Sequence, residues 1–327
     1  MKIAIIGAGF TGLACTFYAC SSQQTTNVAL FDRSSIGAGA SGVAAGCMHP
    51  YAPYSFKYAW QGPEALKDAL ELIDIASQEN KGDPPLIRQG LCRLFLKDEA
   101  PFPTPPTEAT IFCKEKIKLH FPYLDPVEHM CCLHQGYSVD TKRYLKNLWR
   151  VCERLGAGFE KRNIQSFKEL EDYDHIIACT GAYAREIEEA KDVAISQQKG
   201  QLLTLAWDPD MQPPQYPLHM RGYLVMAEDA ASCYAGATFE RSFQDPFPDR
   251  ERAEAEIRKK LHEFSPACSA LQFLDCQAGL RAYAKNRLPL IVPLSEKHWM
   301  VSGMGSKGLL YHAFCAKTVM QQMGIIL

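Results

Sequence analysis

The chain has 327 residues, of which 47% are hydrophobic and 22% are charged, and its formal net charge is −2. These values are typical of a globular protein long enough for two domains, and they exclude an intrinsically disordered chain. Proteins that bind a polyanion through its phosphates usually have a basic balance or a basic stripe, and this sequence has neither, so nucleic acid is disfavoured as a partner.

The chain begins with a predicted strand and a glycine-rich turn. Residues 3–6 are apolar and rich in isoleucine, which is typical of a buried strand. The turn has the spacing GxGxxG at Gly7, Gly9 and Gly12, and a helix is predicted over residues 13–20. In a dinucleotide-binding fold the first glycine allows the tight turn, the second lets the backbone approach a pyrophosphate, and the third lets the helix pack closely.

A second predicted strand, residues 27–31, ends at an acidic residue. Asp32 lies 20 residues after Gly12, about where a ribose-binding carboxylate is expected. The order of strand, turn, helix, strand and acid predicts a dinucleotide site with the phosphates at the helix N-terminus. The alternative is a surface turn followed by an unrelated aspartate.

A loop of small residues follows, over residues 37–50. Its many glycines and alanines make a poor strand and a poor helix. We expect backbone in this loop to approach a cofactor closely; the alternative is a flexible surface loop. His49 lies in the same loop and could titrate near pH 7, or could simply be solvated.

The next region departs from the alternation of strand and helix. Residues 64–78 have the apolar spacing of an amphipathic helix, residues 90–96 resemble a strand, and the proline-rich run 101–106 breaks regular structure. We therefore expect a second domain to be inserted here.

The chain then returns to the first domain. A helix is predicted over residues 141–155, capped by Asp140, and a buried strand begins at Asp174 and ends in a glycine turn at Gly181. This strand should lie parallel to the first one, with Gly181 near the cofactor.

The remaining segments predict a second sheet and then a second glycine turn at the start of a helix. Short strands over residues 201–205, 222–226 and 233–238 suggest an antiparallel sheet, and a charged helix follows over 249–264. The last elements are a strand at 299–302, a glycine loop at 303–308 and a helix at 309–323.

The 13 cysteines are an odd number in a long chain, and three glycines interrupt the apolar start, so no secretory signal is predicted. We therefore expect reduced thiols in a cytoplasmic protein. No CxxC pair occurs, so no metal site is expected. No stretch reaches the roughly 18 apolar residues of a membrane span.

Five motifs in order resemble the D-amino-acid oxidase superfamily of FAD-dependent amine oxidoreductases, which includes glycine oxidase and the flavin domain of a bacterial tRNA-modifying enzyme. They are ASGVAAGCMHP at 40–50, Tyr223–Val225, Gly236–Glu240, Gly279–Arg281 with Arg287–Pro289, and Gly303–Leu309. The resemblance covers most of the chain and implies FAD as the cofactor. A nicotinamide dehydrogenase would share the first 32 residues but would not need the terminal glycine loop.

The resemblance implies a set of FAD-binding residues. Those at the ADP half are Gly7, Gly9, Gly12 and Asp32, and Arg33 and Ser41 would lie near the ribose and phosphates. Ile164, in a short strand after Gly158, would lie at the adenine, and Gly181 would lie under the diphosphate. Those at the isoalloxazine are Gly46, Cys47 and Met48 along the ring and Gly305, Lys307, Gly308 and Leu309 at its far edge.

Three residues are candidates for the reaction itself. Arg281 would hold a substrate carboxylate by two parallel hydrogen bonds; the alternative is an ordinary surface ion pair. Tyr223 would bind the same carboxylate or close the pocket, or would be packing alone. His49 is the third. The sequence departs from the family at Met226–Ala227, Ala284, Asn286 and Lys307, where an arginine is common, and these changes leave the substrate open.

The resemblance implies an α/β fold with a Rossmann-like FAD-binding domain and an inserted antiparallel-sheet (α+β) substrate domain. We assign residues 1–55, 134–196 and 275–327 to the FAD-binding domain and residues 56–133 and 197–274 to the substrate domain. The oligomeric state is not indicated.

The implied reaction is oxidation of the C–N bond of a small carboxylated amine, of the glycine, sarcosine or D-amino-acid type, by hydride transfer to the flavin. One alternative is demodification of the carboxymethylaminomethyl group of a wobble uridine in tRNA, which the net charge disfavours. Another is a flavin-binding protein without amine oxidase activity.

Overall fold

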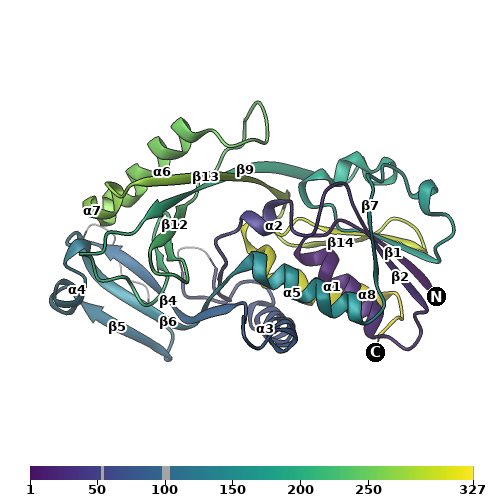
Figure 1. Ribbon diagram of the computed structural model, residues 1–327, viewed down its shortest axis with the longest axis horizontal. Helices are drawn as coiled ribbons and strands as arrows, with labels where there is room; N and C mark the ends of the chain where they lie inside the picture. The colour runs from purple at the N-terminus through teal and green to yellow at the C-terminus, as the bar shows by residue number, and fades with distance from the viewer. Residues whose placement is uncertain (53–54, 98–103, 327) are drawn as a thin grey trace.

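The computed structural model describes residues 1–52, 55–97 and 104–326. Its elements form two sheets at opposite ends of an elongated molecule, and both chain termini lie beside the first sheet (Figure 1). The predicted irregular run 101–106 lies partly outside the described residues.

The first sheet has the strand order β14–β15–β8–β1–β2–β7. Every neighbouring pair is parallel except β14 with β15. Its strands are β1 (Lys2–Ile6), β2 (Asn27–Asp32), β7 (Gly158–Lys161), β8 (His175–Ala178), β14 (Leu290–Pro293) and β15 (His298–Ser302). The predicted parallel pairing of the strand that begins near Asp174 with the first strand is confirmed.

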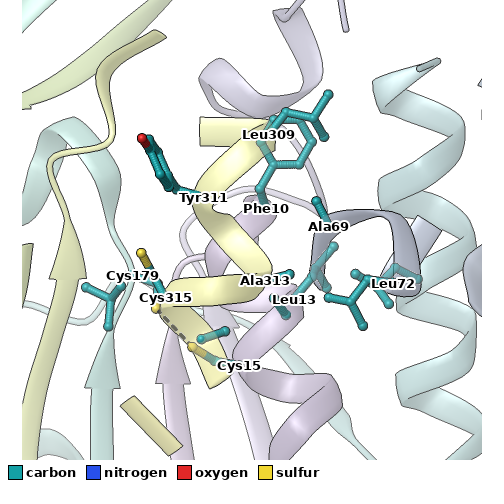
Figure 2. Close-up of a cluster of buried hydrophobic side chains, with 14 of the residues drawn as sticks. Phe10, Leu13, Cys15, Ala69, Leu72, Cys179, Leu309, Tyr311, Ala313 and Cys315 are labelled. Carbon is teal, nitrogen blue, oxygen red and sulfur yellow. Dashed lines mark hydrogen bonds between the residues drawn. The ribbon is translucent and has the colours of Figure 1, made fainter. Parts of the chain in front are cut away.

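Helices cover this sheet because their apolar faces share one core with it. They are α1 (Phe10–Ser21), α3 (Gly62–Glu79), α5 (Thr141–Arg154) and α8 (Gly308–Gln322). Figure 2 shows the meeting of α1, α3 and α8, where Leu13 and Ala313 are fully buried and Leu72 is nearly so. Asp140 accepts a hydrogen bond from the Arg143 backbone N–H at 2.9 Å, which confirms the predicted cap of α5.

The second sheet has the order β13–β9–β12–β11–β10–β4–β6–β3, with β5 also paired to β6. Its strands are β3 (Cys47–Met48), β4 (Leu86–Leu96), β5 (Ala109–Cys113), β6 (Val127–Val139), β9 (Ile195–Ala206), β10 (Leu218–His219), β11 (Tyr223–Met226), β12 (Ser232–Gly236) and β13 (Phe273–Ala284). The pairs are antiparallel, as predicted, apart from β10 with β4, which is parallel.

The remaining helices and 3₁₀ turns complete the fold. They are α2 (Ala40–Val43), α4 (Lys114–His120), α6 (Arg250–Phe264), α7 (Pro266–Ser269) and the 3₁₀ turns η1 (Pro122–Leu124), η2 (Phe167–Leu170), η3 (Gly181–Glu186), η4 (Glu188–Ala190) and η5 (Gly305–Lys307). The long pair β9 and β13 arches from the second sheet to the first (Figure 1). No helix of the described residues is long and apolar enough to cross a bilayer.

Several expectations are corrected. The loop over residues 37–50 contains α2 and β3, because β6 supplies hydrogen-bond partners for Cys47 and Met48. Long strands β6 and β13 were not predicted, since polar and small residues interrupt their alternation. The expectation of reduced thiols is wrong for Cys92 and Cys132, which lie opposite each other on β4 and β6 and form a disulfide. The other cysteines of the described residues are free.

Candidate active site

The first glycine turn packs backbone directly against backbone. Gly7 has φ +104°, and a Cβ there would lie 2.5 Å from the carbonyl oxygen of Cys179. A Cβ on Gly12 would lie 1.7 Å from the carbonyl oxygen of Gly7. No other residue fits at Gly12, so α1 starts in direct contact with the ends of β1 and β8, as the sequence predicts.

Asp32 ties the turn to the following loop. One carboxylate oxygen, Oδ2, accepts the Ala8 backbone N–H at 2.8 Å, and the other, Oδ1, accepts the Ser34 backbone N–H at 2.8 Å. The parallel pairing of β1 with β2 brings these groups together. Each oxygen retains a further lone pair, so the carboxylate can still accept from a ribose hydroxyl.

The N-terminus of α1 has the features of a phosphate site. Its first turn contains no acidic residue, so the positive end of the helix dipole is not compensated. Ser41, on α2, accepts the Phe10 N–H at 3.1 Å, and a Cβ on Gly9 would lie 2.9 Å from the Ser41 hydroxyl. Gly9 and Ser41, both predicted to lie near the diphosphate, are therefore neighbours in the fold.

The carboxyl end of β8 adds polar groups on the other side of the turn. The Thr180 hydroxyl is buried and has no hydrogen-bond partner within the described part of the chain. Gly181 has φ +56°, and a Cβ there would meet nothing within 4 Å. Ser302 donates to the Gly181 carbonyl at 3.0 Å. These groups suit a ligand that runs past the end of β8.

The terminal glycine loop lies beside the first glycine turn. Thr11 contacts the sulfur of Met304 at 3.5 Å, and a Cβ on Gly308 would lie 3.8 Å from the Phe10 ring. Gly305 lies under the Tyr283 ring, which a Cβ would approach to 2.2 Å. Leu309 packs with Phe10 in the core (Figure 2).

The small-residue loop reaches the site from the opposite side. A Cβ on Gly46 would lie 1.8 Å from the Val139 carbonyl oxygen, so this glycine is required for the pairing of β3 with β6. Met48 is buried, and burial raises the pKa of the Cys47 thiol to about 12, so the thiol stays protonated.

One predicted cofactor residue lies outside its expected strand, and another contacts protein groups. Ile164 is buried, but it lies beyond β7, which ends at Lys161. The Arg33 guanidinium stacks on Tyr183 at 3.7 Å and pairs with Glu186 at 3.1 Å, so its described contacts are with protein groups. Their roles at the cofactor remain predictions.

The second sheet makes room at glycines for two of the side chains that the sequence suggests as candidates for the reaction. The Arg281 guanidinium lies over Gly200, where a Cβ would come within 2.3 Å of its Cζ. The Tyr223 hydroxyl lies over Gly236, where a Cβ would come within 2.5 Å. Both glycines lie on neighbouring strands of the sheet, β9 and β12.

Arg281 has no carboxylate partner among the described residues. Its Nη1 donates to the Thr238 carbonyl at 3.2 Å, and its Cζ lies 4.9 Å from the centre of the Phe239 ring. The remaining N–H groups of the fork are available to an acceptor. The geometry therefore differs from that of an ordinary surface ion pair.

Tyr223 begins a row of rings across the sheet. Its ring stacks on that of His219, with the ring centres 6.1 Å apart, and His219 meets His49 edge-on at 5.9 Å. Burial raises the pKa of Tyr223 to about 12, although Arg281 opposes that shift. The phenol is therefore protonated and can donate.

The expectation that His49 titrates near pH 7 is wrong. Burial lowers its pKa well below the ordinary value, and Lys307, His219 and Arg93 lower it further. Burial lowers the pKa of His219 to about 4. Both rings are therefore neutral at pH 7.

Lys307 joins the terminal loop to the small-residue loop. Its Nζ donates to the Tyr51 carbonyl at 2.7 Å and lies 3.5 Å from the His49 carbonyl. Burial, and next the Arg93 charge, lower its pKa to about 8. Arg93, on β4, holds the segment that follows this loop by donating to the Ser55 and Ala52 carbonyls.

Sequence reasoning missed Gly200, His219 and Arg93. His219 and Arg93 are partners in the register of β10 with β4, and Gly200 and Gly279 are partners in the register of β9 with β13. No local motif marks such pairings. The spacing of Gly200 just before an apolar strand is the single signal that was available.

These observations fit a dinucleotide. Gly9 has no side chain and is partly accessible at the start of α1, the Thr180 hydroxyl is buried without a described partner, and Asp32 retains lone pairs for a ribose. The described residues hold no cluster of three or more His, Cys, Asp or Glu suited to a metal ion.

Comparison with known proteins agrees with this geometry. The family model for FAD dependent oxidoreductases, DAO, matches residues 2–322. Glycine oxidase from Geobacillus kaustophilus superposes with a TM-score of 0.82 at 17% identity, over 99% of this chain and 94% of that one. Iminodiacetate oxidase from Chelativorans sp. BNC1 gives 0.80 at 20% identity, over 99% and 95%.

The similar curated sequences are tRNA 5-methylaminomethyl-2-thiouridine biosynthesis bifunctional proteins. The one from Albidiferax ferrireducens is 29% identical over 127 residues, which is 33% of this chain and 21% of that protein. The one from a Polaromonas species is 26% identical over 184 residues, or 48% and 29%. The match therefore spans less than a third of either relative.

Proposed function

Because this chain belongs to the DAO family of FAD-dependent oxidoreductases and uses FAD as its cofactor, we propose that it oxidises the C–N bond of a small amine that carries a carboxylate. Glycine, sarcosine and D-amino acids are the types of substrate we have in mind. The observation that carries the proposal is the half-buried Arg281, which has no carboxylate partner among the described residues and uses only Nη1, toward the Thr238 carbonyl, so its other N–H groups have no described acceptor.

The proposal assigns a task to each part of the site. A bound FAD would supply a two-electron acceptor, so that the substrate loses a hydride from the carbon next to nitrogen and a proton from nitrogen, and the resulting imine is open to hydrolysis by water. The start of α1, with Gly9 and Ser41, would bind the diphosphate, and Asp32 would bind the ribose.

Arg281 would hold the substrate carboxylate by two parallel N–H bonds, which fixes the direction of the Cα–H bond. The protonated Tyr223 hydroxyl would donate to the same carboxylate. Arg281 cannot be replaced by lysine without loss, because an ammonium lacks the planar fork.

The experiment is the visible spectrum of the purified protein before and after anaerobic addition of glycine, sarcosine and D-alanine. We expect a flavin band that bleaches with at least one of these amines. Arg281→Lys should raise the concentration needed for half-maximal bleaching about 10-fold or more, because it loses one charge-assisted hydrogen bond. The matched control, Arg154→Lys, changes an exposed ion pair and should leave bleaching unchanged.

A band that none of the three amines bleaches would count against the small-amine proposal. No band after addition of FAD would count against the cofactor residues named above.

The second candidate substrate is a tRNA whose wobble uridine carries a carboxymethylaminomethyl group, which also presents an amine and a carboxylate. The similarity to the tRNA-modifying proteins supports this candidate, although the net charge of −2 does not. Bleaching by such a tRNA, with no bleaching by free amines, would favour it. We also propose a cytoplasmic location, which cell fractionation would test.

A further inference from the structure

Three side chains with hydrogen-bond donors lie beside Tyr223, and one of them, His219, lies on its far side from Arg281. They are His49, His219 and Lys307, and we call them the distal cluster. The strand order β9–β12–β11–β10 puts His219 and Gly200, over which Arg281 lies, on opposite sides of Tyr223. The ring of Tyr223 contacts the ring of His219, which in turn contacts the ring of His49, so the two histidines extend from Tyr223 without a gap.

The distal cluster has unused donors. Nδ1 of His49 accepts the Tyr51 backbone N–H at 3.2 Å, so in the neutral ring Nε2 carries the hydrogen. The described residues provide no acceptor for that N–H and none for the ring N–H of His219. Lys307 spends two of its three N–H groups on the Tyr51 and His49 carbonyls, which leaves the third.

The cluster also has positive charge that no described acid balances. Arg93, buried on β4, is the register partner of His219 and lies close enough to lower the pKa of His49, His219 and Lys307. In the part of the chain that the structure describes, neither Arg93 nor Lys307 forms an ion pair. Arginine and lysine are rarely buried without an anionic partner.

The resemblance places the isoalloxazine beside Lys307, and this ring could accept a hydrogen bond, but its oxidised form carries no charge that would balance Lys307 and Arg93. A group that satisfies several donors and also carries negative charge is a carboxylate or a similar acid. We propose that the distal cluster binds a second acidic group of the substrate, so that the preferred amine carries two carboxylates. Arg281 holds the carboxylate next to the reacting carbon, and His49, His219 and Lys307 hold the other. This inference rests on the proposed function, which supplies the first carboxylate.

Ligands that cannot be oxidised test the second subsite without turnover. The FAD-loaded protein is titrated at pH 7 with acetate and with succinate, and binding is followed by the shift of the flavin spectrum and by the melting temperature. We expect succinate to bind about 10-fold or more tightly than acetate, because it adds a charge-assisted hydrogen bond. Equal dissociation constants would overturn the inference.

Variants assign that difference to the distal cluster. Lys307→Gln should bring the ratio of the two dissociation constants close to 1, and Lys307→Arg should restore it. His219→Phe keeps the ring stack on Tyr223 but removes the donor, so it should lower the ratio about 3-fold even where Lys307→Gln fails to fold. A ratio unchanged in His219→Phe and in every folded Lys307 variant would contradict the assignment.

Two substrates then separate this inference from the proposed function. Iminodiacetate and sarcosine share one N-carboxymethyl group, and iminodiacetate has a second carboxylate where sarcosine has a hydrogen. We expect iminodiacetate to bleach the flavin anaerobically at about a 10-fold lower concentration. Bleaching by sarcosine with no advantage for iminodiacetate would overturn the second subsite and leave the proposed function in place. No bleaching by either compound would overturn both.

Discussion

The two sheets of this protein use glycine in different ways. At the first sheet, Gly12 lets one backbone lie against another only five residues away, at Gly7. At the second sheet, Gly200 and Gly236 make room for side chains, Arg281 and Tyr223, that come from other strands. The cofactor half is therefore determined by spacing within one short segment. The placement of Arg281 and Tyr223 in the substrate half is determined by strand register.

The largest expected effect is at the backbone contact. Gly12→Ala places a methyl group where the Gly7 carbonyl oxygen cannot move aside, so we expect a loss of about 3 kcal/mol or more in the free energy of unfolding, together with loss of bound FAD. Urea unfolding and the ratio of flavin to protein measure both.

The control for this substitution is Gly82→Ala, at an exposed residue where a Cβ would come no closer than 4.0 Å to its nearest neighbour, Asn80. It should change neither quantity. Full FAD content in Gly12→Ala would show that α1 is not packed as described.

The disulfide offers a test confined to the second sheet. Removing it by the double substitution Cys92→Ala with Cys132→Ala opens a loop with a sequence separation of 40, so we expect a loss of about 3 kcal/mol in the free energy of unfolding while FAD stays bound. Cys113→Ala removes an exposed free thiol and is the control. Equal urea midpoints for the double variant and the parent would contradict the disulfide.

The same contrast explains what the sequence could predict. The turn at Gly7, the acid at Asp32, the cap at Asp140 and the strand that returns beside β1 were all predictable, because each depends on residues close in sequence or on a continuous apolar run. The ring row was not, because the partners of His219 lie on β4 and β11 and no local pattern specifies that register. The lowering of the His49 pKa was also missed, because it is caused by burial, and burial is a property of the folded state.

The glycine beneath Arg281 should affect function more than stability. In Gly200→Ala the new methyl group meets the end of a flexible side chain, which can move, so we expect little change in unfolding. The displaced guanidinium should weaken substrate binding about 10-fold, measured by anaerobic titration of the flavin band. Gly158→Ala, where a Cβ meets nothing within 4 Å, is the control. Loss of FAD from Gly200→Ala would show that this glycine of the second sheet also affects cofactor binding, which would contradict the comparison of the two sheets.

The smallest effect concerns the pH dependence of stability. Burial lowers the pKa of Lys307 from 10.5 to about 8, so between these pH values the unfolded chain binds more protons and the contribution of Lys307 to stability rises with pH. Lys307→Met should therefore show a shallower rise in melting temperature than the parent between pH 8 and 10. Lys118→Met, at an exposed lysine, should keep the slope of the parent. Identical slopes in both variants would argue against a buried ammonium at Lys307.

The most direct test of the proposed carboxylate clamp compares sarcosine with its amide, sarcosinamide, which keeps the amine and the reacting carbon but lacks the charge. Anaerobic stopped-flow measurement of flavin reduction gives the rate and the apparent dissociation constant for each. We expect sarcosine to be about 100-fold more effective with the parent protein, and the two compounds to become nearly equal with Arg281→Met. Equal reduction of the parent by both compounds, or a preference for sarcosine that is undiminished in Arg281→Met, would show that Arg281 does not hold the substrate carboxylate.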